Sequence, residues 1–234
     1  MKKKIAIIGS GIGGLTLGNL LKKNTNFEFV IYEKEKFFNL EEGFGVQLSV
    51  NSVLILNQIG FEKLDKSQKY YPKKLNFYSI NYNKICDLDL TLFNSTDEKY
   101  TTIKRSVLIK FLKEKLFINS ILFGKKITGI VNKNEKININ FTDGSSDIVD
   151  YLIVSDGIFS NTKSIIEKNF IKPTFYGAVA IRVPVEIKDI TEIDISNISL
   201  IMGPKAHLVL YPVNQKKEIN LVCIIRKKSE DIGS

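Results

Sequence analysis

The glycine-rich segment that ends the first apolar run constrains the fold more than any other feature of the chain. Ile5–Ile8 is followed by glycines at positions 9, 11, 13 and 14, and an apolar segment continues to Leu21. A second apolar run, residues 27–32, ends at the acidic Glu33. Strand, glycine turn, helix, strand and terminal acid, in this order, form the layout of a dinucleotide-binding βαβ unit. The sequence therefore predicts a Rossmann-like nucleotide-binding domain in this part of the chain.

Each glycine of this loop has a separate predicted task. Gly9 allows a tight turn, Gly11 lets a pyrophosphate approach the backbone, and Gly14 lets the helix pack closely on the strand. The phosphates would then lie at a helix N-terminus, where free N–H groups and the helix dipole attract negative charge. No basic side chain is needed for this first contact.

Glu33 narrows the choice of nucleotide. It lies about 20 residues past the glycines, where a carboxylate can accept hydrogen bonds from both hydroxyls of an adenosine ribose. A ribose phosphate would be repelled there, so we expect FAD or NAD rather than NADP.

Two other interpretations of the N-terminal segment start from the same residues. A glycine turn without a ligand is the first, since such turns are common in soluble chains. A signal peptide is the second, because Met1–Lys4 precedes an apolar stretch. The glycines inside that stretch, and the lack of a small-residue cleavage pattern before Lys22, argue against the signal peptide.

Composition excludes several classes of protein. The 234 residues are 44% hydrophobic and 25% charged, which is ordinary for a globular protein, and no apolar run free of glycine and charge is long enough to span a membrane. The net charge of +9 comes from lysines spread along the chain, without a nucleic-acid motif.

Cys86 and Cys223 have no metal-ligand spacing, and we expect two buried thiols in a reducing, cytoplasmic setting. His207 is the only histidine, which argues against hydrolase triads and zinc sites.

The rest of the chain alternates between helical and strand-like segments. We expect helices at 51–59, stopped by Gly60, and at 106–116. Strands are expected at 75–80, 85–92, 126–131, 137–141, 148–154, 176–185, 207–213 and 218–226, with a hairpin turn at 142–144. The pattern predicts an α/β fold in which a nucleotide domain (residues 1–72 and 101–165) is interrupted by a sheet-based second domain (73–100 and 166–234).

Taken together, these motifs resemble the FAD-dependent aromatic monooxygenases, in the salicylate and 3-hydroxybenzoate hydroxylase branch of the para-hydroxybenzoate hydroxylase superfamily. The glycine loop and Glu33-Lys34 are similar to that family's adenosine site. The segment 43–51, which contains Gln47, resembles the stretch after its second strand. Arg105, followed by Leu108, matches an arginine that opens a helix and reaches the FAD. The resemblance implies that these residues bind FAD.

Two later motifs extend the resemblance along the chain. Residues 152–163, centred on Asp156-Gly157, resemble the family's D-G motif, which serves both flavin and pyridine nucleotide. Residues 176–182 and 203–212 resemble its substrate-domain strands. His207 and Tyr211 share one face of such a strand with Val209. The resemblance implies that they face the aromatic substrate, His207 as a base or hydrogen-bond partner and Tyr211 as an orienting group.

The implied reaction is hydroxylation of an electron-rich aromatic ring with O₂, with NAD(P)H as the reductant and FAD as the cofactor. Lys163 departs from the family, which usually has arginine there, and lysine lacks the planar fork of arginine. The family's later G-D motif is not in this sequence, so we expect the chain to be C-terminally incomplete. Two alternatives stay open: a truncated or degenerate FAD-binding protein, and a flavin-dependent reductase, dehydrogenase or epoxidase on the same scaffold. Neither the substrate nor the oligomeric state follows from the sequence.

Overall fold

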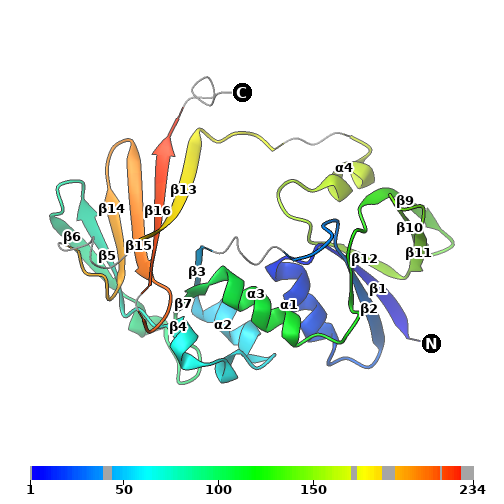
Figure 1. The fold of residues 1–234 in the computed structure, drawn as a ribbon, viewed down its shortest axis with the longest axis horizontal. Helices are drawn as coiled ribbons and strands as arrows, with labels where there is room; N and C mark the ends of the chain where they lie inside the picture. The colour runs from blue at the N-terminus through cyan, green and yellow to red at the C-terminus, as the bar shows by residue number, and fades with distance from the viewer. Residues whose placement is uncertain (1, 39–43, 170–172, 186–192, 217, 228–234) are drawn as a thin grey trace. The chain divides into compact units, whose positions relative to one another are not determined.

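The computed structural model describes residues 2–38, 44–169, 173–185, 193–216 and 218–227 (Figure 1). The chain divides into two compact units. Unit 1 comprises residues 1–40 and 109–174, and unit 2 comprises 41–108 and 175–234.

Unit 1 is built on a parallel sheet with strand order β12-β1-β2-β8. Its strands are β1 (Lys3–Ile8), β2 (Phe27–Tyr32), β8 (Ile121–Leu122) and β12 (Tyr151–Val154). Helix α1 (Ile12–Leu21) connects β1 to β2. The predicted βαβ unit is confirmed, and its central strand β1 pairs with both β2 and β12.

One face of this sheet packs against α1. Leu15 is fully buried, and a Cβ added at Gly18 would lie 3.0 Å from Ile31 Cδ1. The Asn19 amide donates to the Leu112 carbonyl at 2.8 Å, which ties α1 to helix α3 (Arg105–Glu114). The helix predicted at 106–116 thus forms, one or two residues earlier than expected.

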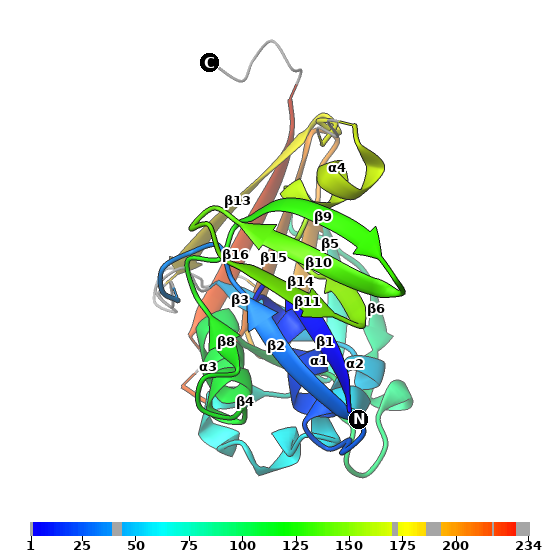
Figure 2. The same ribbon diagram turned by 90° about the vertical axis from the view of Figure 1, so that its right-hand side faces the viewer.

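The other face packs against an antiparallel sheet with strand order β11-β10-β9, and the two sheets lie next to each other (Figure 2). Its strands are β9 (Ile127–Lys133), β10 (Lys136–Phe141) and β11 (Ser146–Val149). Apolar side chains of both sheets form one core: Ala6, Ile8, Tyr32, Ile127, Ile139, Phe141 and Val149.

The single strand predicted at 148–154 is wrong, because two strands divide this segment. β11 pairs with β10 and β12 pairs with β1, so the chain passes from one sheet to the other at Asp150. The carboxylate of Asp150 accepts the Lys4 backbone N–H at 2.8 Å and pairs with Lys136 at 2.6 Å. These contacts with β1 and β10 hold the crossing point in place. The hairpin turn predicted at 142–144 does join β10 to β11.

Unit 2 contains a six-stranded sheet with strand order β13-β16-β15-β14-β5-β6. Every neighbouring pair is antiparallel except β14 and β5. Its strands are β5 (Lys74–Ser79), β6 (Lys84–Asp89), β13 (Ala178–Val185), β14 (Ile198–Met202), β15 (Ala206–Pro212) and β16 (Ile219–Arg226). Strand β14 was not predicted.

A second, three-stranded sheet of unit 2 has the order β3-β7-β4. It consists of β3 (Gly45–Leu48), β4 (Lys69–Tyr70) and β7 (Thr101–Lys104). Helix α2 (Val50–Asn57) follows β3, and short 3-10 helices lie at Phe61–Lys63, Lys66–Gln68 and Leu90–Phe93. Gly60 has a φ of 90° just beyond α2, in keeping with its predicted role as a helix stop.

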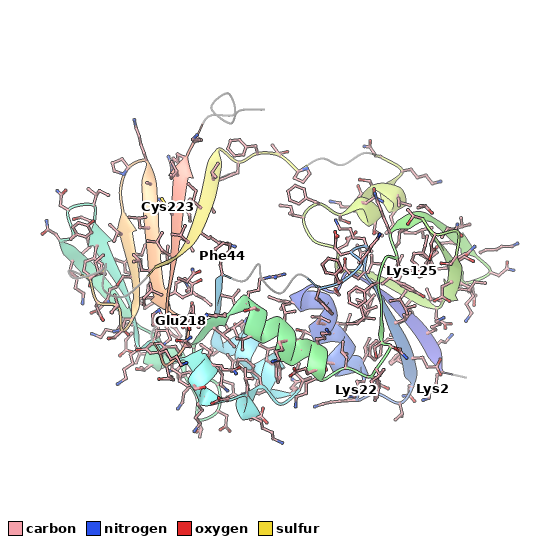
Figure 3. The ribbon with its side chains drawn as sticks, in the orientation of Figure 1. Lys2, Lys22, Phe44, Lys125, Glu218 and Cys223 are labelled. Carbon is pink, nitrogen blue, oxygen red and sulfur yellow. The ribbon has the colours of Figure 1, made fainter. Side chains whose placement is uncertain are left out.

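The prediction of two buried thiols is wrong. Cys86 is exposed, because it lies on β6, the edge strand of the six-stranded sheet. Cys223, labelled in Figure 3 on β16, is half-buried. No helix in the described part of the chain combines the length and apolar character needed to cross a membrane.

Candidate functional site

The carboxyl ends of three neighbouring parallel strands form the candidate nucleotide site of unit 1. Gly9 follows β1, Glu33 follows β2 and Ser155-Asp156 follows β12. Ligands of open α/β sheets bind at this edge. The turn after β1 is tight, since Gly9 has a φ of 99° and donates its N–H to the Tyr32 carbonyl at 2.8 Å.

The three predicted glycines differ in what surrounds them. A Cβ at Gly9 would lie 2.6 Å from the Ser155 carbonyl oxygen, and one at Gly14 would lie 2.0 Å from the Gly9 carbonyl oxygen. Both positions therefore need glycine for the fold itself. A Cβ at Gly11 would meet nothing within 4 Å. Gly11 is also the N-cap of α1, and no hydrogen bond from a described side chain caps that end of the helix.

The Glu33 carboxylate is held in place by the glycine loop. Its Oε2 accepts the Ser10 backbone N–H at 2.8 Å and the Ser10 hydroxyl at 2.7 Å, while Oε1 accepts the Glu35 N–H at 3.1 Å. Burial alone would raise the pKa of Glu33, but the hydrogen bonds from Ser10 hold that pKa below its usual value. Glu33 is thus an oriented anion beside the N-terminus of α1.

Asp156 contributes a second carboxylate to the same edge. Its Oδ2 accepts from the Thr162 hydroxyl at 2.7 Å and from the Thr162 N–H at 3.3 Å. Its Oδ1 is buried and has no hydrogen-bond partner among the described residues. A buried acceptor without a donor is costly unless a ligand supplies one. This oxygen therefore fits a ligand hydroxyl.

Sequence reasoning missed Ser10 and Thr162, which orient the two carboxylates. The only signal was a hydroxyl residue inside the glycine loop and another six residues after Asp156.

Lys34 is exposed and lies 4.0 Å from the Glu35 carboxylate. Lys163, at the position where the resembling family has arginine, lies on α4 (Asn161–Glu167) and pairs weakly with Glu167 at 3.9 Å.

The other predicted site residues lie in unit 2. Arg105 begins α3, and its backbone N–H donates to the carbonyl of Phe44, labelled in Figure 3, at 2.9 Å. Gln47 lies on β3, where its Oε1 accepts the Tyr100 hydroxyl at 2.8 Å. His207 and Tyr211 lie on β15.

The predicted face of β15 is seen in the packing. Val209 and Tyr211 pack with Leu90, Ile198 and Val213, whereas Leu208 and Leu210 pack with a different cluster on the opposite side. His207 belongs to the Tyr211 side by strand alternation, next to Met202 and Ile224 on the neighbouring strands. Its Nδ1 is buried and finds no partner in the described residues. An imidazole nitrogen with unused hydrogen-bonding capacity thus lies on a mostly apolar sheet face.

Comparisons with known proteins agree with this architecture. The family model described as an NAD(P)-binding Rossmann-like domain matches residues 7–38, which include the glycine loop and Glu33. Fold and sequence therefore agree on a Rossmann-like domain in this part of unit 1.

The relatives are more specific. Salicylate hydroxylase of Pseudomonas putida is 24% identical, over 97% of this chain and 55% of its own length. The 6-hydroxynicotinate 3-monooxygenase of Bordetella bronchiseptica is 26% identical, over 69% of this chain and 43% of its own length. The chain thus spans about half the length of the curated relatives it matches. The resemblance to aromatic monooxygenases inferred from the motifs is confirmed by these matches.

Solved structures show the same fold. Klebsiella pneumoniae HpxO, complexed with FAD and uric acid, superposes with a TM-score of 0.85 at 20% identity, covering 99% of this chain and 58% of that one. A salicylate hydroxylase substrate complex gives a TM-score of 0.79 at 21% identity, covering 97% of this chain and 57% of that one. The predicted fold class, an α/β fold with a Rossmann-like domain and a sheet-based second domain, is confirmed.

Proposed function

We propose that the protein is a FAD-dependent monooxygenase that hydroxylates an aromatic substrate, with NAD(P)H and O₂ as co-substrates. The observation that carries the proposal is the set of groups at the carboxyl edge of the parallel sheet. The uncapped helix N-terminus at Gly11 suits a pyrophosphate, and the oriented Glu33 carboxylate suits a ribose. The Asp156 oxygen that has no partner among the described residues suits a further hydroxyl. Relatives that match nearly the whole chain and hydroxylate aromatic compounds support the same assignment.

The residues of unit 1 fit the adenosine and phosphate half of FAD. Gly9 and Gly14 shape the turn and the helix approach, and Gly11 leaves room for the pyrophosphate. Glu33 would accept ribose hydroxyls, and its low pKa keeps it charged, which disfavours the ribose phosphate of NADP. Lys34, Arg105, Gln47 and Asp156 are proposed as further FAD contacts.

FAD, when bound, would supply the redox chemistry that activates O₂, with NAD(P)H as the reductant. The chain itself would bind and orient the substrate. His207 is proposed to draw the proton from a phenol or to accept its hydrogen bond, since a neutral imidazole has one nitrogen that can accept a proton. Tyr211 would orient the ring.

Three further assignments remain predictions. The domain boundaries at 72/73, 100/101 and 165/166 describe expected functional domains, whereas the compact units divide the chain at other positions. A cytoplasmic location and the absence of nucleic-acid partners rest on composition alone.

The activity is tested by following NAD(P)H oxidation and product formation together, in protein expressed from the complete reading frame, with salicylate as the first probe. We expect NAD(P)H oxidation that increases with the probe and yields a hydroxylated product. His207→Gln should lower the rate of hydroxylation by about 10²-fold or more, as for loss of a general base. Tyr211→Phe removes the hydroxyl that is proposed to orient the substrate ring. Tyr82→Phe makes the same change at an exposed hairpin tip and serves as its control.

Two outcomes would contradict the proposal in different ways. Probe-stimulated NAD(P)H oxidation without an oxygenated product, across a panel of aromatic acids and phenols, would favour a reductase. Unchanged hydroxylation by His207→Gln would remove His207 from the mechanism while leaving the enzyme class intact.

A further inference from the structure

Strand β3 lies close against the ring of Tyr211, which belongs to the six-stranded sheet of the same unit. A Cβ added at Gly45, the first residue of β3, would lie 2.7 Å from Tyr211 Cε2 and 2.7 Å from Val213 Cγ1. Real Cβ atoms do not come this close to another side chain. A residue other than glycine at this position would therefore push β3 away from Tyr211.

The side chain of Asn220 holds this contact with a hydrogen bond. Asn220 on β16 lies directly opposite Tyr211 on β15, so the two side chains point to the same side of the sheet. The Asn220 Oδ1 accepts the Gly45 N–H at 2.7 Å. A Cβ at Gly45 would also lie 2.9 Å from Asn220 Cβ. Gly45 thus contacts both members of this cross-strand pair.

The hydrogen bond supplies an acceptor that β3 needs. β3 is an edge strand of its sheet, where β7 pairs with one side only. A half-buried N–H on the other side needs an acceptor from elsewhere in the fold. Because the Gly45 N–H can only donate, Asn220 must present its amide oxygen and turn its NH₂ group away. That NH₂ nitrogen is buried and has no partner among the described residues, so this contact uses Asn220 as an acceptor.

Other contacts join the same two sheets and do not involve Asn220. The fully buried Thr102 of β7 donates its hydroxyl to the carbonyl of Pro212, the last residue of β15. Lys104, the last residue of β7, pairs with Glu218, which is labelled in Figure 3 and precedes β16. These contacts should preserve the fold when Asn220 is replaced.

We propose that Asn220 is a positioning residue that holds the Gly45 end of β3 against the Tyr211 ring. Gln47 lies two residues further along β3, so the same contact sets its distance from Tyr211. Gln47 is a proposed FAD contact and Tyr211 a proposed substrate contact, so the value of this spacing for hydroxylation rests on the proposed function. The hydrogen bond itself belongs to the fold of unit 2. One consequence is therefore measurable without flavin, and another needs the reaction.

The flavin-free consequence is measured at Gly45, in protein from the complete reading frame. In protein that is deuterated except at glycine and tyrosine, a nuclear Overhauser effect should join the Gly45 Hα protons to the Tyr211 ring. Tyr211→Phe removes that ring and so assigns the signal. Asn220→Leu should weaken the signal and speed the exchange of the Gly45 amide hydrogen by about tenfold or more, because the N–H loses its acceptor. Asn220→Asp keeps an acceptor oxygen and should preserve both.

The second consequence is measured in the FAD-loaded enzyme, as kcat and as hydroxylated product formed per NAD(P)H oxidised. We expect Asn220→Leu to lower kcat by about tenfold or more while FAD still binds, and Asn220→Asp to recover most of that loss. Asn76→Leu is the matched control, because Asn76 is a buried asparagine on β5 of the same sheet and faces the opposite side. It should lower the urea midpoint but leave kcat and product yield unchanged.

Two results would overturn the proposal. One is an Overhauser signal and a Gly45 exchange rate that are the same in Asn220→Leu and in the parent protein. The other is a kcat that falls equally in Asn220→Leu and Asn76→Leu. Should Asn220→Leu not fold, Asn220→Ala removes the same acceptor and takes its place. Should the parent protein hydroxylate no probe, the proposed function fails, and the flavin-free measurement still decides whether Asn220 holds β3.

Discussion

At the scale of single residues, the glycine loop separates positions that the fold needs from positions that a ligand needs. Gly9 and Gly14 are enclosed by backbone atoms of the loop and of Ser155, so the fold leaves no room for a side chain at either position. Gly11 has empty space where a side chain would lie. The sequence predicted a separate task for each of the three glycines, and their surroundings in the structure differ in the same way.

A pair of alanine substitutions tests this difference. Gly14→Ala should destabilise the protein by about 3 kcal/mol or more, because the new methyl meets a carbonyl oxygen of the backbone at 2.0 Å. Gly11→Ala should change stability by less than about 1 kcal/mol, since it meets no atom within 4 Å, yet weaken nucleotide binding. Urea unfolding, paired with a FAD titration, measures both effects. Equal stability of the two variants would contradict the packing argument.

At the residue scale, the carboxylates of the candidate site could be predicted from the sequence, but the hydroxyl groups that orient them could not. Glu33 and Asp156 were predicted, because a carboxylate after a strand is a readable signal. Ser10 and Thr162 were not, because a hydroxyl becomes significant only when the fold places it at hydrogen-bond distance. The hydrogen-bond partner of Tyr100, Gln47, likewise lies more than fifty residues earlier in the chain.

At the scale of elements, the local sequence pattern was sufficient for the βαβ unit and for one hairpin. The βαβ unit and the hairpin of β10 and β11 follow from apolar periodicity and turn residues. Strand β14 was missed although it pairs with β15, which follows it directly; its second partner, β5, lies about 120 residues earlier and pairs with it in parallel. The division of residues 146–154 into β11 and β12 was missed for a similar reason, since β12 is defined by its pairing with β1.

Asp150 makes the junction between β11 and β12 sensitive to acid. Its hydrogen-bonded ion pair with Lys136, joined by the Lys4 N–H and by Lys3, lowers the pKa of Asp150 to about 2. An unfolded aspartate titrates near about 3.9, so the stabilising effect is present above that pH and is lost as the pH falls towards 2. Asp150→Asn should therefore lower the urea midpoint at pH 7, and the difference from the parent protein should shrink in acid.

The control for this comparison is Asp97→Asn, at an exposed position of unit 2. It should leave the urea midpoint unchanged at every pH. A difference between Asp150→Asn and the parent protein that stays constant from pH 7 to pH 2 would show that the carboxylate charge is not what holds the junction.

At the scale of the whole molecule, the two units carry complementary parts of one proposed reaction. Unit 1 holds Gly9, Gly11, Gly14, Glu33, Lys34 and Asp156, and unit 2 holds Gln47, Arg105, His207 and Tyr211. The fold class was predictable, because the motifs that define it occur in order along the chain. The grouping of these residues into compact units was not, since it depends on contacts between distant segments such as β14 and β5.

The central claim is that the carboxyl edge of the parallel sheet binds FAD, and equilibrium binding tests it most directly. The protein from the complete reading frame is titrated with FAD and followed by flavin absorption and fluorescence, with Gly11→Val as the blocked variant. We predict one FAD per chain, a perturbed flavin spectrum, and loss of binding in Gly11→Val without loss of folding. Absence of flavin binding, or equal binding by the Gly11→Val variant, would contradict the account.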